Sequence, residues 1–136
     1  MHDHNHFVAD ITLKAVLEHR GKILMTSGDG KRWELPGGRL NNGEQPVAGV
    51  VREISEELGV DVEPTGILDA FAFVSSAGNN HLAVVYRCHP MSDINKIRPN
   101  DGEIVDMRWI TQDEVDQLTM WPQYKTLLHR LFDRTA

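Results

Sequence analysis

The segment that decides the fold spans residues 38–60 and reads GRLNNGEQPVAGVVREISEELGV. Its second half carries an apolar stripe at helical spacing, formed by Val47, Val50, Val51, Ile54 and Leu58. Pro46 suits the first turn of a helix, where a missing N–H leaves no bond unmade, and Gly59 suits the residue that ends one. The pattern therefore predicts a helix over residues 45–58 with one buried face.

The same helix has an acidic side. Glu53, Glu56 and Glu57 stand three and four positions apart, so their carboxylates lie close together. Like charges at this spacing repel one another unless a positive group lies between them. A hard divalent cation such as Mg²⁺ binds carboxylate oxygens well. A solvated acidic stripe is the alternative interpretation, because glutamate is common on exposed surfaces.

With its flanks, this segment resembles the signature of the Nudix hydrolase family. All the fixed positions of that signature are present, namely Gly38, Glu44, Arg52, Glu53, Glu56, Glu57 and Gly59. The preceding residues 33–37, WELPG, also fit the family. The resemblance implies an α/β (α+β) fold, an α/β/α sandwich with a mixed central sheet. The order of the strands and helices expected elsewhere in the chain agrees with that architecture.

The resemblance also implies an activity. Family members are pyrophosphohydrolases that cleave a nucleoside diphosphate linked to another moiety X, by attack of water on phosphorus. The reaction is assisted by Mg²⁺ or Mn²⁺, with one to three ions. Carboxylates and a divalent cation suit this chemistry, since phosphoryl transfer requires charge neutralisation and an activated water.

The resemblance assigns metal ligands residue by residue. Glu56 and Glu57 are implied as the principal ligands. Glu53 is implied either as a ligand or as the base that deprotonates the water, and the carbonyl of Gly38 as a further ligand. Glu103 lies six residues before Trp109, where many members carry a glutamate that reaches the metal or acts as the base.

Two further residues of the signature are implied as support for the site. Arg52 is expected to orient a catalytic glutamate. Glu44 is expected to support the site without binding the metal itself.

Residues that contact the substrate are harder to predict. Many members have an Arg or Lys after the second strand to hold phosphate, whereas this chain has Ser27. Arg39 is the first candidate to replace it, with Lys31 and Arg32 as others.

A second substrate-binding region is expected near the C-terminus. Met120-Trp121-Pro122 is similar to the purine-pocket segment of some members, with Gln123-Tyr124 where those members have an acidic pair. Trp121 and Gln123 are therefore candidate base contacts, and packing under the C-terminal helix is the alternative for Trp121. Phe71, Phe73 and Trp33 are expected in the core.

Three classes of function remain open. The first is an enzyme acting on a small nucleotide such as a (d)NTP, a nucleotide sugar or an ADP-ribose-like compound. The second is a regulatory module that binds a nucleotide without turnover, although such modules tend to lose the signature glutamates that this chain keeps. The third is removal of pyrophosphate from RNA 5′ ends, which a formal net charge of −6 disfavours because it repels a long polyanion.

The rest of the chain predicts a single domain. We expect a flexible tail at residues 1–6 and one domain over 7–136. Strand-like patterns occur at residues 8–19, 23–25, 33–35, 65–75, 81–88 and 104–110. The first two are expected to form one hairpin, and the fourth and fifth another. Thr111 begins a short helix with a capping box, and residues 122–132 form a C-terminal helix.

Length and composition limit the possible size, location and class of the protein. The chain has 136 residues, enough for one domain with a sizeable core. One cysteine, Cys88, excludes a disulfide framework, and we expect a cytoplasmic protein. No apolar run reaches the roughly 20 residues of a membrane span. A monomer or a homodimer is expected, with a small nucleotide as partner.

Overall fold

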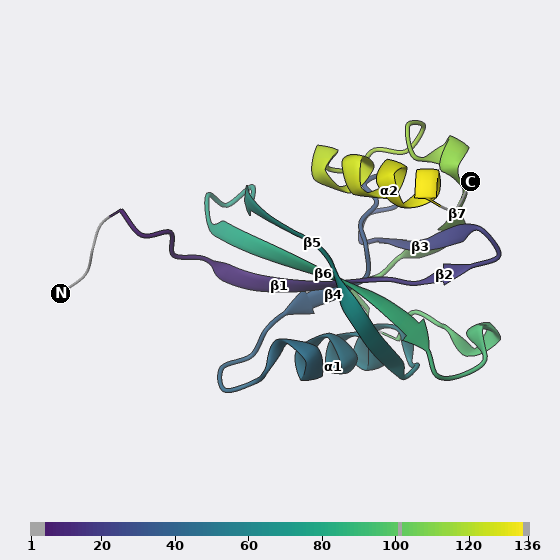
Figure 1. Cartoon of the computed structure of the whole chain (residues 1–136), viewed down its shortest axis with the longest axis horizontal. Coiled ribbons are helices and arrows are strands. Elements are labelled where there is room, and N and C mark those ends of the chain that lie inside the picture. The colour runs from purple at the N-terminus through teal and green to yellow at the C-terminus, as the bar shows by residue number, and fades with distance from the viewer. Residues whose placement is uncertain (1–4, 101, 135–136) are drawn as a thin grey trace.

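The computed structural model describes residues 5–100 and 102–134 of the chain (Figure 1). Most of the tail predicted at residues 1–6 lies outside the described residues. The secondary structure consists of β1 (Asp10–Val16), β2 (Glu18–His19), β3 (Lys22–Ser27), β4 (Gly37–Arg39), α1 (Pro46–Leu58), β5 (Val62–Val74), β6 (Asn80–Pro90), η1 (Ile94–Lys96), β7 (Asp106–Ile110), η2 (Gln112–Glu114) and α2 (Pro122–Arg134).

The strands form two sheets between two helices. One sheet is mixed, with the order β4-β1-β6-β5 and with β1 parallel to β6. The other is antiparallel, with the order β2-β3-β7. Helix α1 covers one side of the sheets and α2 the other (Figure 1). The predicted α/β sandwich with a mixed sheet is confirmed.

Side chains that alternate along the strands separate the core into two halves. Leu24 on β3 packs in the half that contains α1, whereas its neighbours Ile23 and Met25 pack in the half that contains α2. On β6, Val85 faces the α2 half and Tyr86 the α1 half. Because successive side chains of a strand point to opposite faces, a central strand covered by helices on both sides is apolar at consecutive positions.

Helix α1 forms nearly as the sequence predicts. It begins at Pro46 and ends at Leu58, and Gly59 follows in the left-handed conformation with φ 71°. The Gly59 N–H donates to the carbonyl of Ser55 at 3.0 Å and so closes the last turn. Of the predicted stripe, Val50, Ile54 and Leu58 are fully buried, but the Val47 side chain near the start is exposed.

The first predicted hairpin is corrected by the structure. Residues 8–19 do not form one strand, because β1 ends at Val16 and β2 belongs to the other sheet. Both edges of β1 are already paired, with β4 and with β6, so β3 cannot pair with it. Only the short strand β2 pairs with β3, at Glu18 opposite Ile23 and His19 opposite Lys22.

The predicted strand at residues 33–35 is also corrected. Glu34 makes a single bridge to Thr26, and the segment is otherwise irregular. A strand forms instead at Gly37–Arg39, just after the predicted one. A Cβ atom on Gly37, whose φ is 146°, would collide with the backbone carbonyl of Leu13. Glycine therefore permits a strand pairing that any side chain would prevent.

The remaining elements differ mainly in length. The second hairpin is longer than predicted, with β5 starting at Val62 and β6 ending at Pro90, whereas β7 starts later, at Asp106. The capping box between Thr111 and Glu114 is present. The loop expected after residue 90 contains the short helix η1. None of the helices in the described residues is long and apolar enough to span a membrane.

The packing of α1 makes a prediction about stability. Ile54→Ala removes a fully buried side chain and should lower the free energy of unfolding by about 2–5 kcal/mol. Val47→Ala, on the same helix but with 52% of the residue exposed, should change it by less than about 0.5 kcal/mol. Denaturant unfolding of both variants measures the difference, and equal losses would contradict this packing of α1.

Candidate active site

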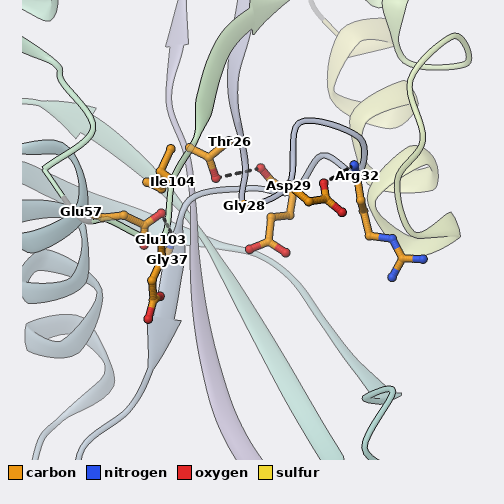
Figure 2. A pocket seen from close by; sticks show the side chains of 9 residues that line it. Thr26, Gly28, Asp29, Arg32, Gly37, Glu57, Glu103 and Ile104 are labelled. Atoms are coloured by element: carbon orange, nitrogen blue, oxygen red, sulfur yellow. Dashed lines mark hydrogen bonds between the residues drawn. The ribbon is translucent and has the colours of Figure 1, made fainter.

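Glu57, from the acidic side of α1, lines a cavity of about 330 Å³, whereas Glu53 and Glu56 are not among its lining residues. Its lining comes from β3 and the loop after it, from β4, from α1 and from the segment before β7 (Figure 2). The lining residues are Thr26, Gly28, Asp29, Arg32, Glu34, Gly37, Glu57, Glu103 and Ile104. Four of these carry carboxylates, so the cavity is acidic despite the presence of Arg32, whose guanidinium points away from Glu57 and Glu103 in Figure 2.

Glu57 is the buried carboxylate of this cavity, with 9% of the residue exposed. The backbone N–H of Gly37 donates to its Oε1 at 3.4 Å. Burial raises the pKa of Glu57 to about 7, although the charge of Lys14 and the Gly37 N–H oppose the rise. A buried carboxyl that is hard to ionise alone is one that a bound cation would stabilise in its charged form.

Glu103 lines the same cavity as Glu57, although 45 residues separate the two in sequence. The carbonyl of Glu103 lies 3.1 Å from the position that a Cβ on Gly28 would occupy. The predicted site residue therefore reaches the cavity because the segment before β7 packs closely on the loop after β3.

Arg52 ties three glutamates together. Its Nε and Nη2 donate to the two carboxylate oxygens of Glu44 at 2.7 and 3.0 Å. Its Nη1 donates to Glu53 at 2.9 Å and to Glu56 at 3.2 Å, and Nη2 also donates to the carbonyl of Arg39 at 3.0 Å. The Arg52 guanidinium holds the pKa of Glu44 below its ordinary value, with help from a backbone N–H.

Gly38 lies directly against Glu53. A Cβ atom at Gly38 would overlap the carboxylate of Glu53. The backbone of β4 and the acidic side of α1 are therefore as close as a glycine permits. The structure places Gly38 beside Glu53, and the ligand role of its carbonyl stays a prediction.

The glutamates do not already form a closed metal cage. Within residues 5–100 and 102–134, no three His, Cys, Asp or Glu side chains are grouped closely enough to hold an ion. Glu56 is largely exposed, and Arg52 bonds Glu53 and Glu56, two of the glutamates that the family resemblance assigned as ligands. The donors themselves are carboxylate and backbone oxygens, which are the ligands that Mg²⁺ and Mn²⁺ prefer. The donor set therefore fits a hard divalent cation.

A second cavity of about 350 Å³ adjoins the first, sharing Glu34 and Gly37 with it. Its lining residues are Thr12, Lys14, Glu34, Gly37, Gly38, Arg39, Phe73, Ser75, His81, Trp121 and Tyr124. The Trp121 and Phe73 rings pack in a T shape with their centroids 4.4 Å apart, and Phe73 stacks on His81 with centroids 4.8 Å apart. An aromatic cavity thus lies directly beside the acidic one.

Two of the predicted substrate contacts, Arg39 and Trp121, line this second cavity, and their contact with a substrate stays a prediction. Gln123 is not among its lining residues, and the Oε1 atom of Gln123 is buried with no hydrogen-bond partner in the part of the chain that the structure describes. Phe73, predicted in the core, lines the cavity instead. Ser27 stabilises the loop after β3, because its hydroxyl donates to the Arg32 carbonyl at 2.7 Å.

Sequence reasoning missed Lys14 and Tyr124. Both are buried, and both line the aromatic cavity. A signal for Lys14 was present, since it is a charged residue between the apolar residues Leu13 and Ala15. Tyr124 was noted only as part of the segment that follows Pro122.

Comparison with known proteins agrees with this geometry, since residues 10–131 match the model of the NUDIX domain. The chain belongs to the Nudix hydrolase family. A MutT-like protein of Streptomyces ambofaciens is 32% identical over 103 residues, which are 75% of this chain and 63% of that protein. An 8-oxo-dGTP diphosphatase of Proteus vulgaris is 45% identical over 40 residues, or 29% of this chain and 36% of that protein. This Nudix hydrolase spans less than two thirds of either relative.

Solved structures show the same fold. A MutT Nudix hydrolase from Burkholderia pseudomallei superimposes with a TM-score of 0.76 at 25% identity, covering 90% of this chain and 98% of that one. Nudix hydrolases are generally metal-dependent and act on nucleotides. The predicted family is confirmed.

The Arg52 network makes a prediction about stability. Arg52→Lys keeps the charge but loses the fork that binds both oxygens of Glu44, and Glu44→Gln removes the partner charge. Each change should lower the melting temperature, and the double variant should lose little more than the worse single variant, because both break one interaction.

The matched control is the pair formed by Arg39 and Asp10, 3.9 Å apart with more exposed side chains. Arg39→Lys and Asp10→Asn should have small effects that simply add, as expected of an exposed ion pair. Fully additive losses for Arg52 and Glu44 as well would contradict the network.

Proposed function

We propose that this Nudix hydrolase is a divalent-metal-dependent enzyme that cleaves a nucleoside diphosphate linked to another moiety X in a small nucleotide, by attack of water on phosphorus. The observation that carries the proposal is the pair of adjoining cavities. One is lined by carboxylates and suits a metal with phosphates, whereas the other is lined by aromatic rings and suits a base. The two cavities share Glu34 and Gly37 in their lining, which supports a single site for a nucleotide.

The metal would be Mg²⁺ or Mn²⁺, one to three ions, which when bound supplies charge neutralisation on phosphate oxygens and lowers the pKa of water. The residues proposed to hold it are Glu53, Glu56, Glu57, Glu103 and the carbonyl of Gly38. Support for Glu57 and Glu103 comes from their position in one cavity. Support for Glu53 and Glu56 comes from their bonds to a single nitrogen of Arg52, which keeps both on one side of α1.

Proton transfer from the attacking water needs a carboxylate near the phosphorus. Glu53 and Glu103 are the two proposed bases, one on the helix and one on the segment opposite it. Arg52 positions Glu53 at 2.9 Å and is itself fixed by Glu44, so Arg52 is proposed to orient the reacting carboxylate, with Glu44 holding Arg52. Glu57, held by the Gly37 N–H, is proposed to remain a metal ligand throughout.

The substrate is proposed to be a nucleoside triphosphate or another compact nucleotide. The aromatic cavity offers Trp121 and Phe73 to a base, and Arg39 lines the same cavity and is proposed to contact the substrate. The name of the Proteus vulgaris relative, an 8-oxo-dGTP diphosphatase, supports the triphosphate class. Nucleotide sugars and ADP-ribose-like compounds would fit the same pair of cavities, with X lying outside the aromatic one.

Glu57→Gln tests the function directly. It keeps the shape of a buried side chain but removes a metal ligand, so turnover with Mg²⁺ should fall by about 10²-fold or more, comparable to the loss of one transition-state contact. Glu63→Gln, an exposed glutamate of β5 outside both cavities, is the matched control and should leave turnover unchanged. Pyrophosphate and phosphate release measure the rates, and melting temperatures check that both variants fold.

A substrate screen completes the test. Nucleoside triphosphates, nucleotide sugars, ADP-ribose, dinucleotides and RNA with a 5′ triphosphate should be compared with Mg²⁺ and with Mn²⁺. Turnover of a small nucleotide, abolished by a chelator, is the expected result. Nucleotide binding without turnover would identify a regulatory module, and preferred cleavage of RNA would identify a 5′-pyrophosphohydrolase; either result would overturn the proposal.

A further inference from the structure

Lys14 is a buried cation that the proposed metal chemistry does not use. It lies on β1 with only 7% of its side chain exposed, and its Nζ donates to Oε1 of Glu34 at 3.3 Å. Among the described residues this is its one hydrogen bond, so two of its three N–H groups have no protein acceptor. These N–H groups can donate to an acceptor on a bound ligand.

The aromatic cavity is the space into which these groups can bond. Lys14, Glu34 and Tyr124 all line it. Tyr124 is 95% buried, since only 5% of the residue is exposed, and its hydroxyl makes no hydrogen bond to any described residue. Glu34 has 51% of its side chain exposed, and its Oε2 takes no part in the bond to Lys14. One wall of an otherwise aromatic cavity therefore offers a charged donor, a charged acceptor and a free hydroxyl.

The combination distinguishes between two parts of a nucleotide. Phosphate oxygens at neutral pH only accept hydrogen bonds, and the carboxylate of Glu34 would repel them. The edge of a nucleobase carries acceptors and N–H donors side by side. A lysine and a glutamate held 3.3 Å apart therefore match the edge of a base better than a phosphate.

We propose that Lys14 and Glu34 form a specificity-determining pair that reads the hydrogen-bonding edge of the substrate's base, with Lys14 donating to a base acceptor and Glu34 accepting from the neighbouring N–H. The inference rests on the proposed function, because it assigns the base to the aromatic cavity. It names two residues that lie outside the family signature. Tyr124, beside them, supplies a hydroxyl that can act as donor or acceptor.

The pair can select among bases because related bases exchange hydrogen-bond donors and acceptors at the same positions of their edges. Guanine and hypoxanthine place a carbonyl acceptor where adenine places an amino donor, and uracil and cytosine differ in the same way. A fixed donor and a fixed acceptor therefore favour one member of each pair. Discrimination of about tenfold or more in kcat/KM between ITP and ATP, or between UTP and CTP, is expected from one such contact.

Glu34→Gln is the decisive variant, because the side chain is half exposed and the change preserves its size. An amide can donate or accept, so the wild-type preference within each pair of bases should shrink to about threefold or less. Glu63→Gln is the matched control, and its preferences should stay as in the wild type. A uniform fall in kcat/KM for all four nucleotides would show that Glu34 acts on phosphate or metal, and would overturn the inference.

Lys14→Met removes the donor and should reduce the same preference, with melting temperature reporting whether the buried site still folds. Calorimetry can measure the affinities of the four corresponding nucleoside monophosphates, IMP, AMP, UMP and CMP. This measurement does not need turnover. If the wild type hydrolyses no nucleotide but its monophosphate preference depends on Glu34, the proposed function fails and the base contact stands. If the wild type hydrolyses nucleotides but Glu34→Gln leaves every ratio unchanged, the base contact alone is wrong.

Discussion

The pairing of β4 with β1 is the contact on which the rest of the site depends. It sets Gly37 opposite Lys14 and Gly38 opposite Leu13. Because neither glycine has a side chain, the backbone of β4 can lie against β1 on one side and against the carboxylate of Glu53 on the other. The Gly37 N–H then reaches Glu57. A methyl group at Gly37 would push β4 off β1 and would separate the two cavities that share this residue.

The sequence predicts well what depends on local spacing. The bounds and acidic side of α1 follow from the helical repeat, and Gly59 ends the helix as expected. Gly38 and Glu103 were predicted from resemblance to the family, and the structure brings each to the acidic side of α1 or its cavity. The assignment of individual ligands and of the base stays a prediction, because the contacts that the structure shows are those of Arg52 with Glu44, Glu53 and Glu56.

What the sequence could not predict depends on contacts between distant segments. The aromatic cavity draws its lining from β1, the loop before β4, the β5–β6 hairpin and the start of α2. No local pattern distinguishes Phe73 in a cavity wall from Phe73 in a core, since both require a partly buried aromatic residue on a strand. The division of residues 8–19 between two sheets could not be predicted for a similar reason. It follows from the pairing of β1 with β4 and β6, which lie far from it in the sequence.

The parallel pairing of β1 with β6 has a consequence for how the chain folds. Asp10 pairs with His81, and Val16 pairs with Arg87. The two central strands of the mixed sheet are therefore far apart in the sequence. Such non-local pairing slows folding, because the entropy cost of closing a long loop comes before the hydrogen bonds of the sheet can form. On the ribosome, α1 is complete before β6 has been synthesised. The mixed sheet that supports the site therefore cannot be complete before β6 is made, although β1 and β4, against which α1 packs, come earlier in the chain.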